Sequence, residues 1–497
     1  SKGSNDFKIF EEDRSKIQYT HIENIFDDYK KQILLPHKLS QFGPAVAVAD
    51  VNGDRLEDVY LGSASGKSSK LYLQTKEGGF VLSGSQPWNF HKALEDVDAV
   101  FFDSDNDGDN DLYVVSGGNE FAPNSSTYLD RLYINNGKGV FSFNRDLLPS
   151  NYNSGSVVRV NDFDNDGDQD LFIASRMIPW NYPEPASSNL LVNNNGKFSN
   201  YYDPNNSFKD LVLVTDGVWS DYDLDGDQDL FVVGEWMPLT LIKNEKGVFT
   251  KQKLNDSCDE VYGWWYSIEA GDLNGDGTED LVLGNLGENY KYKASKEEPF
   301  EVFYDDFDEN GVKDIVLAYY NYGIQFPLRG FSCSSQQVPE LKNKIKKYDL
   351  FASLDVQDVY GQVNLENALR LQANSFKSTV LINKYGKFKN HPLPYQAQLS
   401  SINDFIIDDF NEDGIKDILA IGNLYNAEIE TTRNDAGNGI LLIGNGEGQF
   451  DSKLRKETGF YAPSDAKKII PLSINNQKGV LVGNNNDLLQ YFKTNKP

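Results

Sequence analysis

The sequence has 497 residues, of which 47 are Lys or Arg and 75 are Asp or Glu, and its formal net charge at pH 7 is −28. A chain this acidic is poorly suited to the phosphate backbone of nucleic acids, and it contains no apolar run of about 18 residues that would form a transmembrane helix. It does not open on a signal peptide, so we expect either a mature form or a fragment of a longer protein.

The N-terminal part of the chain contains two short segments of strand-like composition, Phe7–Phe10 and Ile17–His21. They are followed by Ile22–Leu34, which we interpret as a short helix. The repeating part of the sequence begins after these segments.

A nine-residue motif then recurs seven times along the chain. Each copy has Asp or Asn at positions 1, 3 and 5 and Asp at position 9. The side chains concerned are Asp50, Asn52, Asp54 and Asp58; Asp103, Asp105, Asp107 and Asp111; Asp162, Asp164, Asp166 and Asp170; Asp221, Asp223, Asp225 and Asp229; Asp272, Asn274, Asp276 and Asp280; Asp306, Asp308, Asn310 and Asp314; and Asp409, Asn411, Asp413 and Asp417. We predict that these residues bind metal ions.

The spacing of these side chains suits calcium, which takes about six to eight oxygen ligands. Alternate side chains of a tight loop point inward, the backbone carbonyl at position 7 adds a ligand, and the carboxylate at position 9 closes the cage. Glycine at position 6 permits the positive φ of the bend in six copies. The first copy has Arg55 at position 6 and Gly53 at position 4, so we expect its bend to differ. About seven structural Ca²⁺ ions would halve the net charge of the protein.

The motif also resembles the start of an EF-hand loop, which requires Glu at position 12. Position 12 is apolar in every copy here, the residues being Leu61, Val114, Ile173, Val232, Leu283, Leu317 and Ala420. Each motif is followed by an apolar run that indicates a strand rather than a helix. A single copy could be a metal-free turn, but so many carboxylates held together without a cation would repel one another. Loops of this kind favour a compartment with high free calcium, outside the cytoplasm.

The region around Asp162 defines the repeating unit. Strand Val157–Val160 enters the motif and strand Leu171–Ala174 leaves it, Asn189–Val192 forms a third strand, and a tight turn leads to a fourth strand that starts at Lys197. Four antiparallel strands in about 50 residues are typical of one blade of a β-propeller. The turn before the fourth strand closes on Phe in six places, namely Phe80, Phe141, Phe198, Phe249, Phe388 and Phe450.

The motif at Asp306 has no such turn of its own. We therefore predict that residues 288–375 are an insertion within the fifth blade, made of an extra calcium hairpin, 301–319, and a partly helical segment, 322–375. Within that segment Pro339–Tyr348 and Leu365–Leu371 have helical composition. The segment is either a solvated lid without a role, or a docking element or cover on the central pocket.

The C-terminal region supplies three further strands, Ile469–Ile474, Gly479–Gly483 and Leu488–Phe492. An N-terminal strand can complete this blade, so 1–21 and 466–497 are predicted to close the ring and leave no open sheet edge. The prediction is a single all-β domain over 1–497, a seven-bladed β-propeller, with eight blades as the alternative if Asp306 founds its own blade. Cys258 and Cys333 could form one disulfide or stay free.

The repeats resemble the FG-GAP/VCBS-repeat propellers, whose best-known member is the integrin α-subunit head. Finer features are similar to the C-terminal propeller of Bacteroidetes surface proteins with ASPIC/UnbV regions, on the segments Leu34–His37, Asp130–Tyr133, Gly234–Pro238 and Gly263–Trp265. This resemblance implies an outer-surface lipoprotein beside a SusC/SusD-type nutrient-uptake complex. The lipid-anchor cysteine that such a protein carries near its N-terminus is not in this sequence.

In the family, partners bind the propeller face opposite the calcium loops, which the loops after each second strand build. Those loops supply the candidate ligand residues Glu120, Arg176, Trp180, Tyr182, Glu235, Trp236, Asn285 and Asn423. Aromatic rings beside amide and charged groups suit a glycan or a peptide. The alternative is that these residues seal the mouth of the channel and pair with one another, as Arg176 could with Glu235.

No catalytic residues are predicted, because the four His residues show no metal spacing and no nucleophile motif is present. The sequence therefore indicates a non-enzymatic, calcium-stabilised binding or scaffold module at the cell surface, with other surface or outer-membrane proteins as partners. A propeller-type polysaccharide lyase, glycosidase or lectin is the alternative, with Glu120 and Glu235 as a carboxylate pair. A purely structural surface component is the third hypothesis.

Overall fold

The computed structural model describes residues 8–254 and 260–495. The fold is all-β, built mainly from four-stranded antiparallel sheets. No helix among these residues combines the length and apolar character needed to cross a bilayer.

Six groups of four strands follow the order of the repeats, each pairing in sequence order within its sheet. They are β2 (Val46–Ala49), β3 (Asp58–Leu61), β4 (Lys70–Gln74) and β5 (Phe80–Leu82); β6 (Glu95–Phe102), β7 (Asp111–Gly117), β8 (Arg131–Asn135) and β9 (Phe141–Phe143); β10 (Ser154–Asn161), β11 (Asp170–Met177), β12 (Asn189–Val192) and β13 (Ser199–Asn200); β14 (Val214–Ser220), β15 (Asp229–Pro238), β16 (Thr240–Glu245) and β17 (Val248–Gln252); β18 (Tyr262–Gly271), β19 (Asp280–Asn285), β24 (Thr379–Lys384) and β25 (Lys387–Pro392); and β26 (Asp404–Asp408), β27 (Asp417–Ile421), β28 (Ile440–Gly444) and β29 (Phe450–Lys453). The fourth and fifth groups join into one eight-stranded sheet, because the end of β15 pairs with β18.

A further sheet joins the two ends of the chain. It contains β30 (Ala466–Pro471), β31 (Gly479–Asn484), β32 (Gln490–Thr494) and the N-terminal β1 (Phe10–Glu12), which pairs antiparallel with β32. Ile17–His21 forms no strand, and Thr20 only bridges to Leu488. Phe7 lies outside the described residues.

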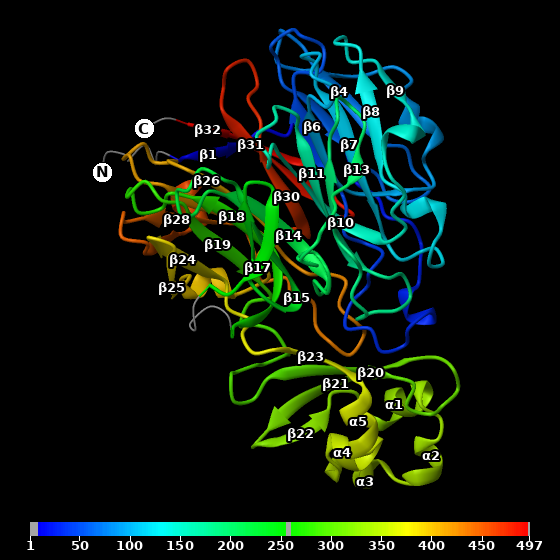
Figure 1. The fold of residues 1–497 in the computed structure, drawn as a ribbon. Coiled ribbons are helices and arrows are strands. Elements are labelled where there is room, and N and C mark those ends of the chain that lie inside the picture. Colours follow the sequence, from blue (N-terminus) through cyan, green and yellow to red (C-terminus); the bar gives the residue numbers. More distant parts are fainter. Residues whose placement is uncertain (1–7, 255–259, 496–497) are drawn as a thin grey trace.

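The first strands of these sheets form a closed ring. Strand β2 contacts β6, and the contacts continue through β10, β14, β18, β26 and β30 back to β2. Apolar residues fill the space between neighbouring sheets: Phe102 and Tyr113 of the second group, for example, pack with Val158 and Leu171 of the third. This closed radial packing of sheets is the architecture of a β-propeller (Figure 1).

An inserted unit projects from one end of the ring, between β19 and β24 (Figure 1). Its sheet has the order β22 (Ile324–Pro327), β21 (Asp314–Asn321), β20 (Phe300–Asp305) and β23 (Leu369–Ala373). The helices are α1 (Phe331–Gln337), α2 (Leu341–Lys344), α3 (Tyr348–Ser353), α4 (Val356–Tyr360) and α5 (Gln362–Asn367), with a sixth, α6 (Arg455–Thr458), elsewhere in the chain.

The inserted sheet is apolar on both faces. Val302 and Leu317 face the ring, where they join the core around Trp236. Phe303 and Val316 face the other way, toward the helices. The period-2 alternation of the strands thus places the sheet between the ring and the helices.

Three helix predictions differ from the structure. Leu365–Leu371 is helical only to Asn367, because Leu369 onward pairs with the open edge of β20. Pro339–Tyr348 contains the short α2 and the first residue of α3. Ile22–Leu34 contains one turn, Asp28–Lys30, because the buried Asp28 carboxylate binds Leu39 N and Ser40 Oγ and holds the chain in an extended path. Cys258 lies outside the described residues, and Cys333 Sγ lies 3.3 Å from Glu430 Oε1.

A recurring amide links adjacent sheets. Asn193 Nδ2 donates to the carbonyl of Ser104 in the preceding sheet (2.8 Å) and to that of Gln169 in its own (3.0 Å). The side chains that take the same role in other sheets are Gln74, Asn135, Asn244 and Asn383. These bonds fix the position of each loop relative to its neighbour.

We predict that Asn193→Ala lowers the free energy of unfolding by about 2–3 kcal/mol, because it leaves two backbone carbonyls without their donor. Asn194→Ala is the matched control, since this neighbouring Asn is exposed. Urea denaturation of the two variants measures the difference, and equal stabilities would contradict the linking role.

Candidate metal loops and the opposite face

The seven aspartate motifs share one backbone conformation, and each is named below by its first residue. Positions 4 and 6 have positive φ in every loop, the pairs being Gly53 and Arg55, Asn106 and Gly108, Asn165 and Gly167, Leu224 and Gly226, Gly275 and Gly277, Glu309 and Gly311, and Glu412 and Gly414. Arg55 has φ 68°. The prediction that the Asp50 loop bends differently is therefore wrong: Arg55 adopts the conformation that glycine takes elsewhere.

Backbone N–H groups hold the carboxylate at position 1. In the Asp162 loop, Asp162 Oδ1 accepts from Asp166 N (3.1 Å) and Oδ2 accepts from Gly167 N (3.0 Å). In the Asp50 loop, Arg55 N donates to Asp50 Oδ2 (2.7 Å) in the place of the glycine. The loop is thus wrapped around this carboxylate.

The carboxylate at position 9 is buried at the start of each second strand. Asp170 Oδ1 accepts from Asn193 N, at the end of the third strand (2.7 Å). Burial is the main cause that raises the pKa of Asp170 to about 7, and the neighbouring Asp164 raises it further. Asp58, Asp229 and Asp314 likewise reach about 7, and Asp111, Asp280 and Asp417 about 6. A nearby cation would favour the charged form of these groups.

The donor set of the loops fits a metal ion. Ligand oxygens of three carboxylates lie within 4.8 Å of one another in the Asp103, Asp162, Asp221 and Asp306 loops. Several loop oxygens are buried without a hydrogen-bond partner, namely those of Asp105 (Oδ1), Asp170 (Oδ2), Asp221 (Oδ1), Asp229 (Oδ2) and Asp308 (Oδ1). Buried acceptors without a donor are costly, and a hard cation is the partner that satisfies them.

The opposite face of the ring is covered by the segment between β1 and β2. Gln32 exchanges two hydrogen bonds with the backbone of Tyr182 (2.8 and 2.9 Å). Asn119 Nδ2 donates to Asp28 Oδ1 (2.9 Å), and Lys38 N donates to the carbonyl of Asn426 (2.9 Å). This segment therefore lies over loops from distant parts of the chain.

Glu235 lies at the centre of the covered face and is fully buried. Its carboxylate forms an ion pair with Arg176, accepts from Tyr182 Oη (2.9 Å) and lies 3.2 Å from His37 Nε2. Burial opposes ionisation, but Arg176 and His37 outweigh it and lower the pKa of Glu235 to about 2. The group is a structural anion whose oxygens are already occupied.

Trp236 is part of an aromatic stack that anchors the inserted unit. Its ring centroid lies 4.9 Å from that of Trp264 and 5.6 Å from that of Phe300 on β20. Tyr292 stacks on Phe300 at 4.6 Å. The insertion is thus attached to the ring through its apolar core rather than by a free linker.

The other candidate ligand residues are also engaged. Asn285 and Asn423 are fully buried and bind backbone groups, for example Ser375 O (3.1 Å) and Gly437 O (3.0 Å). Of the eight residues, only Trp180 and Glu120 are partly exposed. Lys31 Nζ lies over the Trp180 ring at 3.7 Å, while Glu120 lies beside Glu95 and accepts from Asn24 Nδ2 (3.1 Å).

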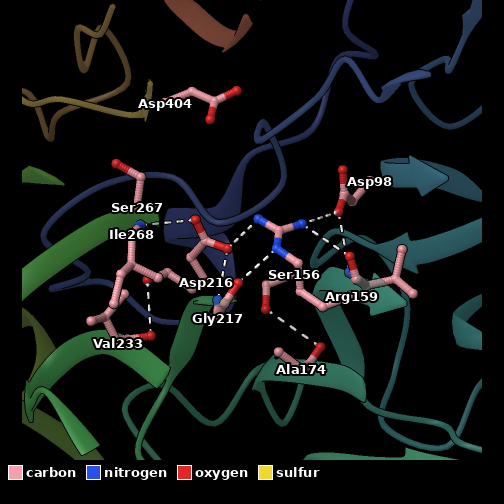
Figure 2. Close-up of polar contacts among 12 residues, drawn as sticks. Asp98, Ser156, Arg159, Ala174, Asp216, Gly217, Val233, Ser267, Ile268 and Asp404 are labelled. Carbon is pink, nitrogen blue, oxygen red and sulfur yellow. Dashed lines mark hydrogen bonds and ion pairs between the residues drawn. The ribbon is translucent and has the colours of Figure 1, made fainter. Parts of the chain in front are cut away.

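A charged cluster on the axis of the ring was missed by the sequence analysis. Figure 2 shows Arg159 between Asp98 and Asp216; its guanidinium pairs with Asp216 and lies 3.4 Å from Asp98 Oδ2. Lys468 Nζ lies 3.5 Å from Asp98 and 4.0 Å from Asp404. A cavity of about 100 Å³ lies among these residues.

The sequence did contain a signal for this cluster. Asp98, Asp216 and Asp404 each stand five residues before the first Asp of a motif. Each accepts a backbone N–H from the first strand of the next sheet, the donors being Val158 (3.1 Å), Ile268 (3.0 Å) and Ile469 (2.8 Å). The cluster therefore ties alternate pairs of sheets together around the axis.

Comparisons with known proteins support the presence of the repeats that the sequence predicts. The FG-GAP-like repeat model matches residues 50–114, 103–173 and 221–283. No curated protein matches the sequence.

Among solved structures, a lectin of Agrocybe aegerita that recognises non-reducing terminal N-acetylglucosamine is similar over 86% of this chain and 96% of its own, at 14% identity and a TM-score of 0.33. The V. cholerae biofilm matrix protein Bap1 is similar over 97% and 91%, at 10% identity and a TM-score of 0.37. Saccharomyces cerevisiae Sqt1 is similar over 92% and 96%, at 10% identity and a TM-score of 0.43.

We predict that Arg55→Gly raises the free energy of unfolding by about 1 kcal/mol, because a side chain at positive φ is strained and glycine is not. Arg55→Ala is the control, since it removes the same charge but keeps a Cβ at this position. Urea denaturation in the same buffer compares them, and equal stability of the two variants would show that the conformation carries no strain.

Proposed function

We propose that this chain is a calcium-stabilised β-propeller of seven blades that acts as a non-enzymatic binding or scaffold module at a cell surface. The observation that carries the proposal is the set of seven loops with one backbone conformation, four of which bury carboxylate oxygens that lack a partner. The FG-GAP-like repeats, which cover five of the seven motifs, support it, because such repeats commonly bind Ca²⁺.

The contacts between first strands around the ring support the proposed count of seven blades. The sheet that begins with β18 takes its outer strands, β24 and β25, from beyond the insertion. The sheet of β20–β23 lies outside the ring and adds no blade. In the proposed count the sheet closed by β1 is the seventh blade, and the Asp306 loop belongs to the inserted hairpin of β20 and β21.

The ions would be structural rather than catalytic. The residues at positions 1, 3, 5 and 9 would hold the cation, and the cation would neutralise carboxylates that otherwise repel one another. A free calcium concentration ten times Kd adds about 1.4 kcal/mol of stability at each site. Several such sites would account for much of the net stability of a domain, commonly about 5–15 kcal/mol.

Glu120 and Glu235 are the two carboxylates considered as a catalytic pair. The burial and the ion pair of Glu235 support the proposal of a non-enzymatic role. Glu235 is enclosed and paired with Arg176, so a substrate would have to displace the covering segment to reach it. Glu120 is accessible in part but has no second accessible carboxylate partner among the predicted site residues. A scaffold role requires neither group to be free.

We place the protein outside the cytoplasm, since FG-GAP repeats are typically extracellular or surface modules. The sequence resemblance to Bacteroidetes surface propellers extends this proposal to an outer-membrane assembly, with a SusC/SusD-type complex or a glycan or peptide as the partner. The inserted unit covers the face that partners use in the family, so we propose that it presents the contact surface at this end of the molecule.

Removal of calcium is expected to lower the melting temperature strongly, because the loop carboxylates lose their cation. Differential scanning calorimetry in excess EGTA and then in millimolar Ca²⁺ measures the shift, and native mass spectrometry counts the ions. Asp166→Ala should carry one ion fewer than the unaltered protein. Asp168→Ala, at position 7 of the same loop, should carry the full number, since only the carbonyl of that residue is a predicted ligand. No calcium-dependent shift and no bound ions would refute the calcium proposal.

Incubation with plant and bacterial polysaccharides is expected to release neither reducing ends nor unsaturated sugars, whether or not a glycan binds. Assays for both products test the non-enzymatic role. Glu120→Gln and Glu235→Gln serve as controls: a release that both variants abolish would replace the scaffold proposal with a glycan-cleaving enzyme.

A further inference from the structure

The Asp221 loop differs from the other loops in one neighbouring side chain. In each sheet of the ring that contains a motif, a residue at or next to the end of the third strand donates its N–H to the position-9 carboxylate, and the residue that precedes this donor belongs to the third strand. That preceding residue is Leu73, Ile134, Val192, Lys243, Ile382 or Ile443 in turn. Only the fourth is charged.

Lys243 is directed into its loop. It is 8% exposed, and its ammonium contacts Asp223 Oδ2 at position 3 and lies 2.9 Å from Asp225 Oδ2 at position 5. These are two of the side chains predicted to hold the metal. The hydrogen bond between the third strand and the position-9 carboxylate is the same as in the other loops of the ring, since Asn244 N donates to Asp229 Oδ1 (2.7 Å).

An ammonium and a divalent ion cannot share these two carboxylates favourably. Both cations would lie within a few ångströms of the same oxygens, where like charges repel each other by several kcal/mol at the effective dielectric constant of about 20 that is typical near a protein surface. A lysine in place of an apolar residue gains nothing from burial unless it is paired. The pairing with Asp223 and Asp225 supplies that compensation for the lysine, while Asp221 Oδ1 and Asp229 Oδ2 of the same loop have no hydrogen-bond partner.

We propose that Lys243 is a built-in cation that holds the Asp221 loop in its folded conformation in place of calcium. The inference rests on the proposed calcium function of the other loops. It adds that this loop is independent of free calcium, so that the fourth blade keeps its turn when the others lose theirs. The metal stoichiometry is then one ion lower than the number of motifs.

Ion counting in paired variants tests this assignment. Native mass spectrometry in millimolar Ca²⁺ should find six ions on the unaltered protein, seven on Lys243→Ile and five on the reciprocal Ile134→Lys, which places an ammonium beside the Asp103 loop. Seven ions on the unaltered protein, or no gain in Lys243→Ile, would overturn the inference and leave the calcium proposal intact. An absence of ions from all three proteins would instead remove the calcium proposal and this inference with it.

Hydrogen exchange provides a second measurement that does not depend on the count. On addition of EGTA, amides 222–229 of the unaltered protein should keep their protection, while amides 163–170 of the Asp162 loop lose theirs. In Lys243→Ile both loops should become calcium-dependent. Lys243→Met, which keeps the length of the side chain, serves if the isoleucine variant does not fold. Equal loss of protection in both loops of the unaltered protein would contradict the role of Lys243.

Discussion

The buried carboxylate at position 9 of each motif is the contact on which the blade architecture depends. Asp170 begins a second strand, and its side chain accepts the N–H at the end of the third strand, Asn193. Its other oxygen is buried without a partner. The Asp170 side chain therefore connects the third strand of its sheet to the loop that we propose as a metal site. The hydrogen bond to the third strand and the proposed bond to a metal ion both offset the free-energy cost of burying the Asp170 carboxylate.

The same logic extends from one sheet to the next. The side-chain amide of Asn193 spans from its own loop to the preceding one, and near the axis Asp98 and Arg159 link neighbouring first strands. The Asn193 amide and the Asp98 carboxylate thus find backbone or charged partners across a sheet boundary. The ring is thus held by polar contacts at its rim and axis and by apolar packing between them.

Most of the candidate ligand residues lie on a face of the ring that the protein's own segments cover. Arg176, Tyr182 and Glu235 form one buried network beneath residues 22–43, and Trp236 anchors the inserted unit. In this protein, residue types that suit a ligand site are used to attach two of its own segments. An outward-facing surface at this end belongs to the insertion, whose helices lie on the far side of its sheet.

The sequence by itself determined the repeats, the loops and the strands around them, because Asp, Asn and Gly at fixed spacing and β-branched runs are local signals. It also placed the extra hairpin and the strands on either side of it. It failed at Arg55, at β23 and at Ile22–Leu34, where pairing with β20 or the buried Asp28 outweighs local preference. Only the tertiary structure decided which candidate residues are covered and that Lys243 enters the Asp221 loop, since both depend on segments brought together by closure of the ring.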